Sequence, residues 1–259
     1  PVGRHGRPLD GEDLDARVTR MSVAVQARGF RVDYPGFTLG PLDFSLEQGE
    51  RVALVGHNGA GKSTAIRALS GRALDYGGSL SYRGVELREA VPDVRGRIGL
   101  LPEKPASFHW MTVAEHFALL SSLQPHWDAG YAELLRDRLN LPARSKVGTL
   151  SRGMSVKLSF IAAEAFHPPL LLLDEPTAGL DPGMREEIVE LVLKAAPAGS
   201  GRVVVFSTHI LEDIHLLAER ILVLRQGRLV ADRPLATLVD QARGEGANRV
   251  LRDLMSGRG

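Results

Sequence analysis

The chain has 259 residues and no cysteine, and its 32 Lys and Arg nearly balance its 31 Asp and Glu, so the formal net charge is +1. Such a balanced charge gives the chain no overall attraction to nucleic acid or to an acidic membrane. Any site that binds an anion must therefore depend on local residues. The absence of cysteine excludes disulfides and thiolate metal sites, and no apolar run in the sequence approaches the ~20 residues of a membrane-spanning helix.

Residues 1–20 are rich in Arg, Asp, Gly and Pro without a sustained period, which predicts a disordered tail or an expression remnant ahead of Met21. They lack the apolar core of a signal peptide, so a cytoplasmic location is expected. From residue 22 to residue 47, apolar and polar side chains alternate around a Pro35-Gly36 turn. This pattern predicts a small antiparallel sheet.

The next segments predict buried strands alternating with helices. A strand at residues 50–55 leads into a glycine-rich loop and a helix near residues 65–69. Residues 104–166 have helical spacing, with Thr112 as a candidate N-cap, and predict an inserted helical subdomain. The other predicted elements are strands at 97–101, 170–173 and 202–208, a helix at 183–196, an edge hairpin within 221–230, and a C-terminal helical extension at 234–259.

The loop after the strand at residues 50–55 is the strongest functional signal. It consists of Gly56, His57, Asn58, Gly59, Ala60, Gly61, Lys62, Ser63 and Thr64. The spacing G-x-x-x-x-G-K-S between a strand and a helix predicts a phosphate-binding loop, and we expect all nine residues to contribute to nucleotide binding. Lys62 is expected to reach the β- and γ-phosphates, and the Ser63 hydroxyl to ligate Mg²⁺. The alternative is a glycine-rich turn with a surface lysine.

Two acids, Asp174 and Glu175, directly follow four leucines. The carboxyl ends of strands in an open α/β sheet form the ligand crevice. We therefore expect Asp174 to hold Mg²⁺, directly or through water, and Glu175 to orient or deprotonate the water that attacks the γ-phosphate. The alternative is a solvated turn or a helix cap. The predicted fold is α/β, a P-loop NTPase (RecA-like) core sheet with an antiparallel β subdomain and an inserted α-helical subdomain.

The order of these motifs resembles the ATP-binding subunit of an ATP-binding cassette (ABC) transporter over about residues 30–229. Residues 56–64 match the Walker A motif and residues 170–175 the Walker B motif. Residues 150–154, Leu-Ser-Arg-Gly-Met, resemble the signature L-S-G-G-Q, residues 178–181 the D-loop, and His209 the switch histidine. The resemblance implies a nucleotide-binding domain at residues 21–233, with its helical subdomain at about 104–166.

The resemblance also implies roles for residues outside the Walker motifs. Tyr34 is expected to stack on adenine, with a core strand tyrosine as the alternative. His209 is expected to complete a catalytic set with Lys62 and Glu175, with a structural histidine as the alternative. A further set is expected to contact the ATP of an opposing subunit: Ser151, Arg152, Gly153, Met154 and Asp181. For Ser151 an ordinary helix cap is the alternative.

Three residues depart from the usual family pattern. Glu103 stands where the Q-loop usually has Gln and is expected to help hold Mg²⁺. In the signature, Arg152 replaces the second-position Gly and Met154 replaces Gln. These changes resemble exporter-type ATPases whose permeases are separate chains. Arg152 is expected either to add charge toward a phosphate in the partner's site or to point to solvent.

The predicted function is an ATPase that dimerises, as a homodimer or a heterodimer, around two Mg·ATP and drives a separate integral-membrane permease, with export favoured over import. The chain would lie on the cytoplasmic face of the membrane, held there by its permease, and no nucleic acid partner is expected. One alternative is a non-transport ABC ATPase, and another is a binding-only partner with a degenerate site in a heterodimer. A GTPase switch or a small-molecule kinase would leave Ser151 and Gly153 unexplained.

Overall fold

Three strands with almost unbroken apolar sequences form the middle of a six-stranded sheet. They are β3 (Arg51–Val55), β8 (Val203–Thr208) and β7 (Leu170–Asp174), and the full order is β10-β9-β3-β8-β7-β6. Parallel pairing joins all of these strands except the edge strand β10, which runs antiparallel to β9. Continuous apolar sequence suits strands that are covered on both faces. The predicted α/β core sheet and its edge hairpin are confirmed.

The computed structural model describes residues 23–72, 75–88, 96–104, 108–197, 199–242 and 245–256. The predicted tail at residues 1–20 lies outside these residues. The other elements are β1 (Val23–Tyr34), β2 (Phe37–Glu47), α2 (Lys62–Leu69), β4 (Gly77–Tyr82), β5 (Val85–Glu86), β6 (Ile98–Leu101), α4 (Val113–Leu123), α5 (Ala129–Arg138), a 3-10 turn (Val147–Thr149), α6 (Arg152–Glu164), α7 (Pro182–Ala195), α8 (Leu211–Leu217), β9 (Arg220–Arg225), β10 (Arg228–Pro234), α9 (Leu235–Ala242) and α10 (Glu245–Ser256).

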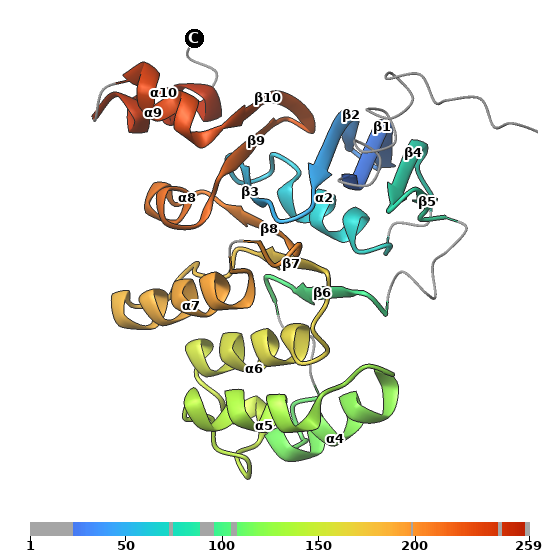
Figure 1. Cartoon of the computed structure of the whole chain (residues 1–259), viewed down its shortest axis with the longest axis vertical. Coiled ribbons are helices and arrows are strands. Elements are labelled where there is room, and N and C mark those ends of the chain that lie inside the picture. Colours follow the sequence, from blue (N-terminus) through green and yellow to red (C-terminus); the bar gives the residue numbers. More distant parts are fainter. Residues whose placement is uncertain are drawn as a thin grey trace, which may run out of the picture.

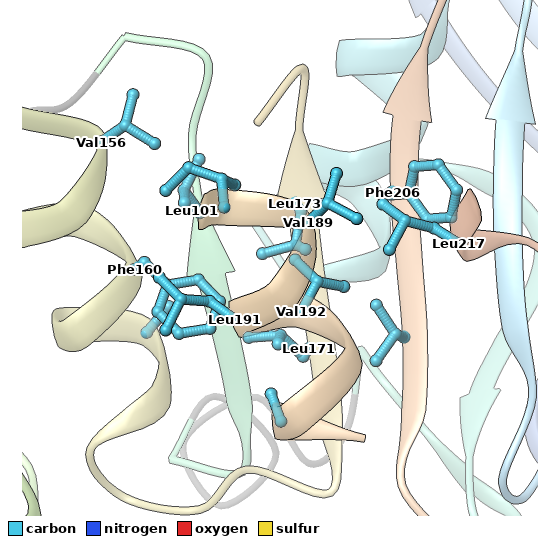
Figure 2. Close-up of a cluster of buried hydrophobic side chains, with 14 of the residues drawn as sticks. Leu101, Val156, Phe160, Leu171, Leu173, Val189, Leu191, Val192, Phe206 and Leu217 are labelled. Atoms are coloured by element: carbon cyan, nitrogen blue, oxygen red, sulfur yellow. The ribbon is translucent and has the colours of Figure 1, made fainter. Parts of the chain in front are cut away.

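Alternate residues of the central strands feed two separate cores. Leu171 and Leu173 of β7 pack in the core that also contains residues of α6 and α7, whereas Leu170 and Leu172 join the core on the α2 side. Figure 2 shows the first of these cores, with Leu171 and Leu173 among side chains that include Phe160. The two-residue period of a strand explains this division, because successive side chains point to opposite faces.

Leu171→Ala should lower the free energy of unfolding by about 2–5 kcal/mol, because it removes a fully buried side chain and leaves a cavity in a close-packed core. Urea denaturation followed by circular dichroism measures the change. The matched control is Leu134→Ala on α5, where the side chain is 57% exposed and the loss should stay within about 0.5 kcal/mol. Equal losses for the two variants would contradict the placement of β7.

A second, antiparallel sheet has the order β2-β1-β4-β5 and confirms the predicted β subdomain. Its strands β1 and β2 lie on either side of the predicted Pro35-Gly36 turn. Register shifts interrupt the β1–β2 pairing, as β-bulges do in antiparallel strands. The sheet lies beside α2 and the glycine-rich loop in Figure 1.

The segment predicted to be helical contains α4, α5 and α6, which lie together at the lower end of the molecule in Figure 1. Thr112 caps α4 as predicted: its hydroxyl accepts a hydrogen bond from the Glu115 amide at 3.2 Å, and the Glu115 carboxylate accepts one from the Thr112 amide at 2.7 Å. Such reciprocal capping satisfies donors that the helix itself leaves unpaired. The C-terminal helices α9 and α10 lie at the opposite end of the molecule.

Within the described part of the chain, none of the helices combines the length and the apolar character needed to cross a membrane.

The short helix α8 was not predicted from the sequence. It has only seven residues, too few for a helical period to stand out.

Candidate functional site

A pocket of about 600 Å³ lies at the carboxyl ends of three neighbouring strands, β3, β8 and β7. Parallel strands bring their carboxyl ends to one edge of a sheet, which is where open α/β folds place their ligands. The residues that line the pocket are Phe37, Asn58, Gly59, Gly61, Lys62, Ser63, Thr64, Glu103, Glu175, Ala178 and His209. Most of these were predicted from the sequence as site residues.

The glycine-rich loop has no room for side chains at two of its glycines. A Cβ at Gly56 would lie 2.4 Å from the Leu224 carbonyl oxygen of β9, and Gly61 has a φ of 105°, which strains any other residue. Gly61 is also the N-cap of α2, and no side chain of the described residues caps this helix. The N–H groups of its first turn therefore remain available to an anion at the positive end of the helix.

Lys62 is held in place by the loop that precedes it. Its Nζ donates to the carbonyl oxygens of Gly56 at 2.8 Å and His57 at 3.3 Å, and it lies 3.2 Å from Oε1 of Glu175. The side chain is only 6% exposed. A cation with so little access to water interacts more strongly with anions than one on the surface does. The predicted phosphate-binding lysine and the predicted catalytic glutamate are thus in direct contact.

Asp174 lies behind the pocket and connects two strands to α2. Its Oδ1 accepts hydrogen bonds from the hydroxyls of Ser63 at 3.0 Å and Ser207 at 2.6 Å. Ser207 stands opposite Asp174 in the register of β7 and β8. Sequence reasoning missed this partner of Asp174, because the pairing depends on which strands are neighbours.

The oxygen atoms of Ser63 and Asp174 fit a magnesium ion. Mg²⁺ in phosphate-binding sites usually takes one or two protein oxygens together with phosphates and waters. The described residues contain no group of three or more His, Cys, Asp or Glu that could hold a metal alone. Glu103, the third predicted ligand, lines the same pocket. These residues therefore suit a metal that binds together with a nucleotide.

Glu175 adopts an unusual backbone conformation, with a φ of 51°. Its amide donates to the Ser207 hydroxyl at 2.9 Å, and its Oε2 lies 2.9 Å from Nδ1 of His209. Left-handed backbone at a residue other than glycine costs free energy, and it is often found where function requires a fixed side chain. The two predicted catalytic residues lie together.

Tyr34 and Phe37 differ in their relation to the pocket. Tyr34 is 45% exposed at the end of β1 and does not line the pocket, whereas its hairpin partner Phe37 does. Sequence reasoning missed Phe37. The tight Pro35-Gly36 turn is the signal that could have found it, because a two-residue turn pairs the residues on either side of it.

The residues expected to act across a dimer serve as caps within this single chain. Ser151 accepts from the Met154 amide at 3.2 Å at the start of α6, and Asp181 accepts from the Met184 amide at 3.0 Å at the start of α7. The expected set, including Gly153, does not line the pocket of its own chain. Arg152 is exposed, and its guanidinium donates to the Ala178 carbonyl oxygen of its own chain, a contact that the sequence did not predict.

A buried acid that sequence reasoning missed joins the loops after β7 and β8. Asp213 of α8 is 1% exposed and accepts hydrogen bonds from Thr177, from Thr208 at 3.4 Å and from Arg185 at 2.8 Å. Thr177 follows Glu175 closely, and Thr208 precedes His209. The network therefore ties together the two segments that carry the predicted catalytic pair.

The family comparison agrees with the geometry of the site. The sequence pattern of the family described as ABC transporter matches residues 39–178, which include the glycine-rich loop, Asp174 and Glu175. The chain belongs to the ABC transporter family. The predictions of an ABC transporter ATP-binding subunit and of its fold class are therefore confirmed.

Individual relatives of this ABC cassette extend the comparison. It is 31% identical over 221 residues to the linearmycin resistance ATP-binding protein LnrL of Bacillus subtilis (strain 168), covering 83% of this chain and 70% of that protein. It is 35% identical over 231 residues to the human phospholipid-transporting ATPase ABCA7, covering 86% of this chain and 11% of that protein. The cassette thus spans about a tenth of the length of the large relatives that it matches.

A solved structure gives the same result for the fold. The structure of an ATP-binding subunit of an ABC transporter superposes with a TM-score of 0.78 at 28% identity, covering 89% of this chain and 99% of that one. Almost all of that subunit is therefore matched in fold by this chain.

Proposed function

We propose that this cassette binds and hydrolyses ATP and that hydrolysis drives transport through a separate integral-membrane permease. The observation that carries the proposal is the contact of Glu175 with both Lys62 and His209 in one pocket. Phosphoryl transfer to water requires a cation that binds the phosphate and a carboxylate that orients the water, and here a histidine holds this carboxylate in place.

Each side chain has a distinct part in the proposed reaction. The loop amides and Lys62 bind the β- and γ-phosphates and offset the charge that develops on the transferred group. Glu175 orients the attacking water and accepts its proton, and His209 keeps the carboxylate aimed at that water. Mg²⁺, when bound, would be held by Ser63 and Asp174, with Glu103 nearby, and would polarise the phosphoryl oxygens. Tyr34 is outside the lining of the pocket, so the proposed stacking of adenine on Tyr34 places the base at the rim, next to the hairpin partner Phe37.

The proposal includes a dimer in which Ser151, Gly153 and Asp181 of one chain complete the pocket of the other. The Ser151 hydroxyl accepts one hydrogen bond as a cap, so its proton is free to be donated to a phosphate across the interface. Size-exclusion chromatography of the purified Glu175→Gln chain with ATP distinguishes a homodimer from a heterodimer, because only a homodimer forms without another subunit.

Export is the proposed direction of transport, and the cytoplasmic face of the membrane the proposed location. The names of two relatives support export: one is a linearmycin resistance ATP-binding protein, and the other is a phospholipid-transporting ATPase. Glu103, Arg152 and Met154 support it too, through their resemblance to exporter-type ATPases. The membrane partner is tested by purifying the chain from its native host. An integral-membrane protein should co-purify with it when detergent is used and should be lost when extraction is done without detergent.

Removal of Mg²⁺ tests the proposed activity. The purified chain should release phosphate from ATP in the presence of Mg²⁺, and chelation with EDTA should reduce release to background. Asp174→Asn should lower turnover by ~10²-fold or more at fixed Mg²⁺, because it weakens an oxygen ligand that Ser63 and Ser207 hold in place. Asp137→Asn, at a carboxylate that is 74% exposed on α5, serves as the control. Turnover that persists in EDTA would contradict the proposal.

A further inference from the structure

Arg152, the first residue of α6, contacts the loop that follows Glu175. Its Nε donates to the Ala178 carbonyl oxygen at 2.9 Å and its Nη2 to the same oxygen at 2.6 Å. Two donors on one oxygen require the fixed geometry of a guanidinium, which a lysine does not have. The two residues lie 26 positions apart in the chain, so the contact depends on how α6 packs against the loop.

Local helix preference does not account for an arginine at this position. The N-terminus of a helix carries the positive end of the dipole, where a cation is unfavourable. The Arg152 side chain is also exposed, so hydrophobic burial does not hold it there. The hydrogen bonds to Ala178 are therefore the main interaction that orients this side chain.

The loop contacted by Arg152 is closed on itself by two backbone turns. The Ala178 amide donates to the Glu175 carbonyl oxygen at 3.2 Å, and the Leu180 amide donates to the Thr177 carbonyl oxygen at 3.3 Å. Ala178 also lines the nucleotide pocket. Ala178 therefore connects Arg152, through its carbonyl oxygen, with the backbone of Glu175, through its amide.

Gly179 allows the guanidinium to lie against the loop. Its φ is 70°, and a Cβ placed there would lie 3.1 Å from Nε of Arg152. On the neighbouring residue of α6, a Cβ at Gly153 would lie 2.8 Å from Cε of Met184 in α7. The starts of α6 and α7 and the loop between Glu175 and Asp181 are thus packed as one unit within a single chain.

We propose that Arg152 is a positioning residue that holds the loop of residues 175–181 in its own chain and thereby fixes the carboxylate of Glu175. This rests on the proposed function, because it assigns Glu175 to water activation. It adds a contact within the chain to the two roles expected from the sequence, a charge directed at a partner's phosphate and a side chain in solvent. Restraint of the loop favours the transition state more than ATP binding, since Arg152 does not line the pocket.

Hydrogen exchange of the nucleotide-free chain tests the contact without any activity. Arg152→Ala should raise the exchange rate of the peptide that holds the Ala178 and Leu180 amides by ~3–10-fold, because those turns lose their outer restraint. Arg152→Lys should give most of the same increase. Arg144→Ala, at another exposed arginine of the helical insert, is the control and should leave the peptide unchanged. No increase in either Arg152 variant overturns the proposal.

Kinetics then test the positioning role. Arg152→Ala should lower kcat for ATP hydrolysis by ~10-fold, because a displaced catalytic group loses most of its effect. The dissociation constant of ATP should stay within about 2-fold, because the binding groups are untouched. Faster exchange with an unchanged kcat also overturns the positioning of Glu175. If the unsubstituted chain hydrolyses no ATP, the proposed function fails, whereas the exchange result still decides whether Arg152 holds the loop.

Discussion

Glu175→Gln should slow ATP hydrolysis by ~10²–10⁴-fold, the usual contribution of a general base, while ATP binding survives. Glutamine keeps the size of the side chain but cannot accept a proton from water. The carboxylate of Glu175 contacts Lys62 at 3.2 Å and His209 at 2.9 Å. Because the variant removes a negative charge next to Lys62, ATP phosphates should encounter less competition for this cation. Phosphate release and equilibrium ATP binding measure the two effects.

The same variant should accumulate an ATP-bound dimer that is visible by size-exclusion chromatography, since hydrolysis no longer separates the subunits. Glu186→Gln is a matched control, because Glu186 is an exposed acid on α7 away from the pocket. Its turnover should equal that of the unsubstituted chain. Near-normal hydrolysis in Glu175→Gln would remove Glu175 from the mechanism and leave another group to activate water.

Lys62→Met should weaken ATP binding by ~10²–10³-fold, as expected for an ion pair worth about 4 kcal/mol at an effective dielectric near 20. Methionine fills much of the same space, so the effect reports lost charge and lost donors more than a cavity. Lys62 also donates to two loop carbonyls, and its loss leaves the loop less restrained. Isothermal titration with ATP in the presence of Mg²⁺ measures the affinity.

Lys157→Met is the control for this substitution. Lys157 on α6 is buried to a similar degree, 8% exposed, and it pairs with Glu187 at 2.9 Å and donates to the Leu139 carbonyl oxygen at 3.1 Å. Both variants remove a buried, paired ammonium, so both should lower thermal stability. Only Lys62→Met should lose ATP affinity, and an equal loss in Lys157→Met would mean that affinity follows overall stability instead.

Much of the site could be predicted because its strongest signals are local. The loop of residues 56–64 places a strand, glycines, a lysine and a helix within one short segment, and Asp174 and Glu175 follow an apolar strand directly. The capping of α4 by Thr112 is local for the same reason, since its partners lie within four residues. In such segments the backbone geometry follows from residue type and spacing.

Contacts between distant segments could not be read in this way. The bond between Ser207 and Asp174 depends on β7 and β8 being neighbours, and the hydrogen bonds of Asp213 depend on a short helix without a clear period. Neither role expected for Arg152 included its hydrogen bonds to the Ala178 carbonyl oxygen, because residue spacing does not show that α6 packs against the loop after β7.

By itself, the sequence determined that this chain has a phosphate loop, a Walker B strand end and the class of fold that presents them. Those features are set by residue type, glycine freedom and the period of buried strands. The tertiary structure decided that Glu175 lies between Lys62 and His209 and that Arg152 holds the Ala178 carbonyl. The physical reason is strand order and helix packing, which bring together residues that are remote in the chain and whose interactions have no trace in local spacing.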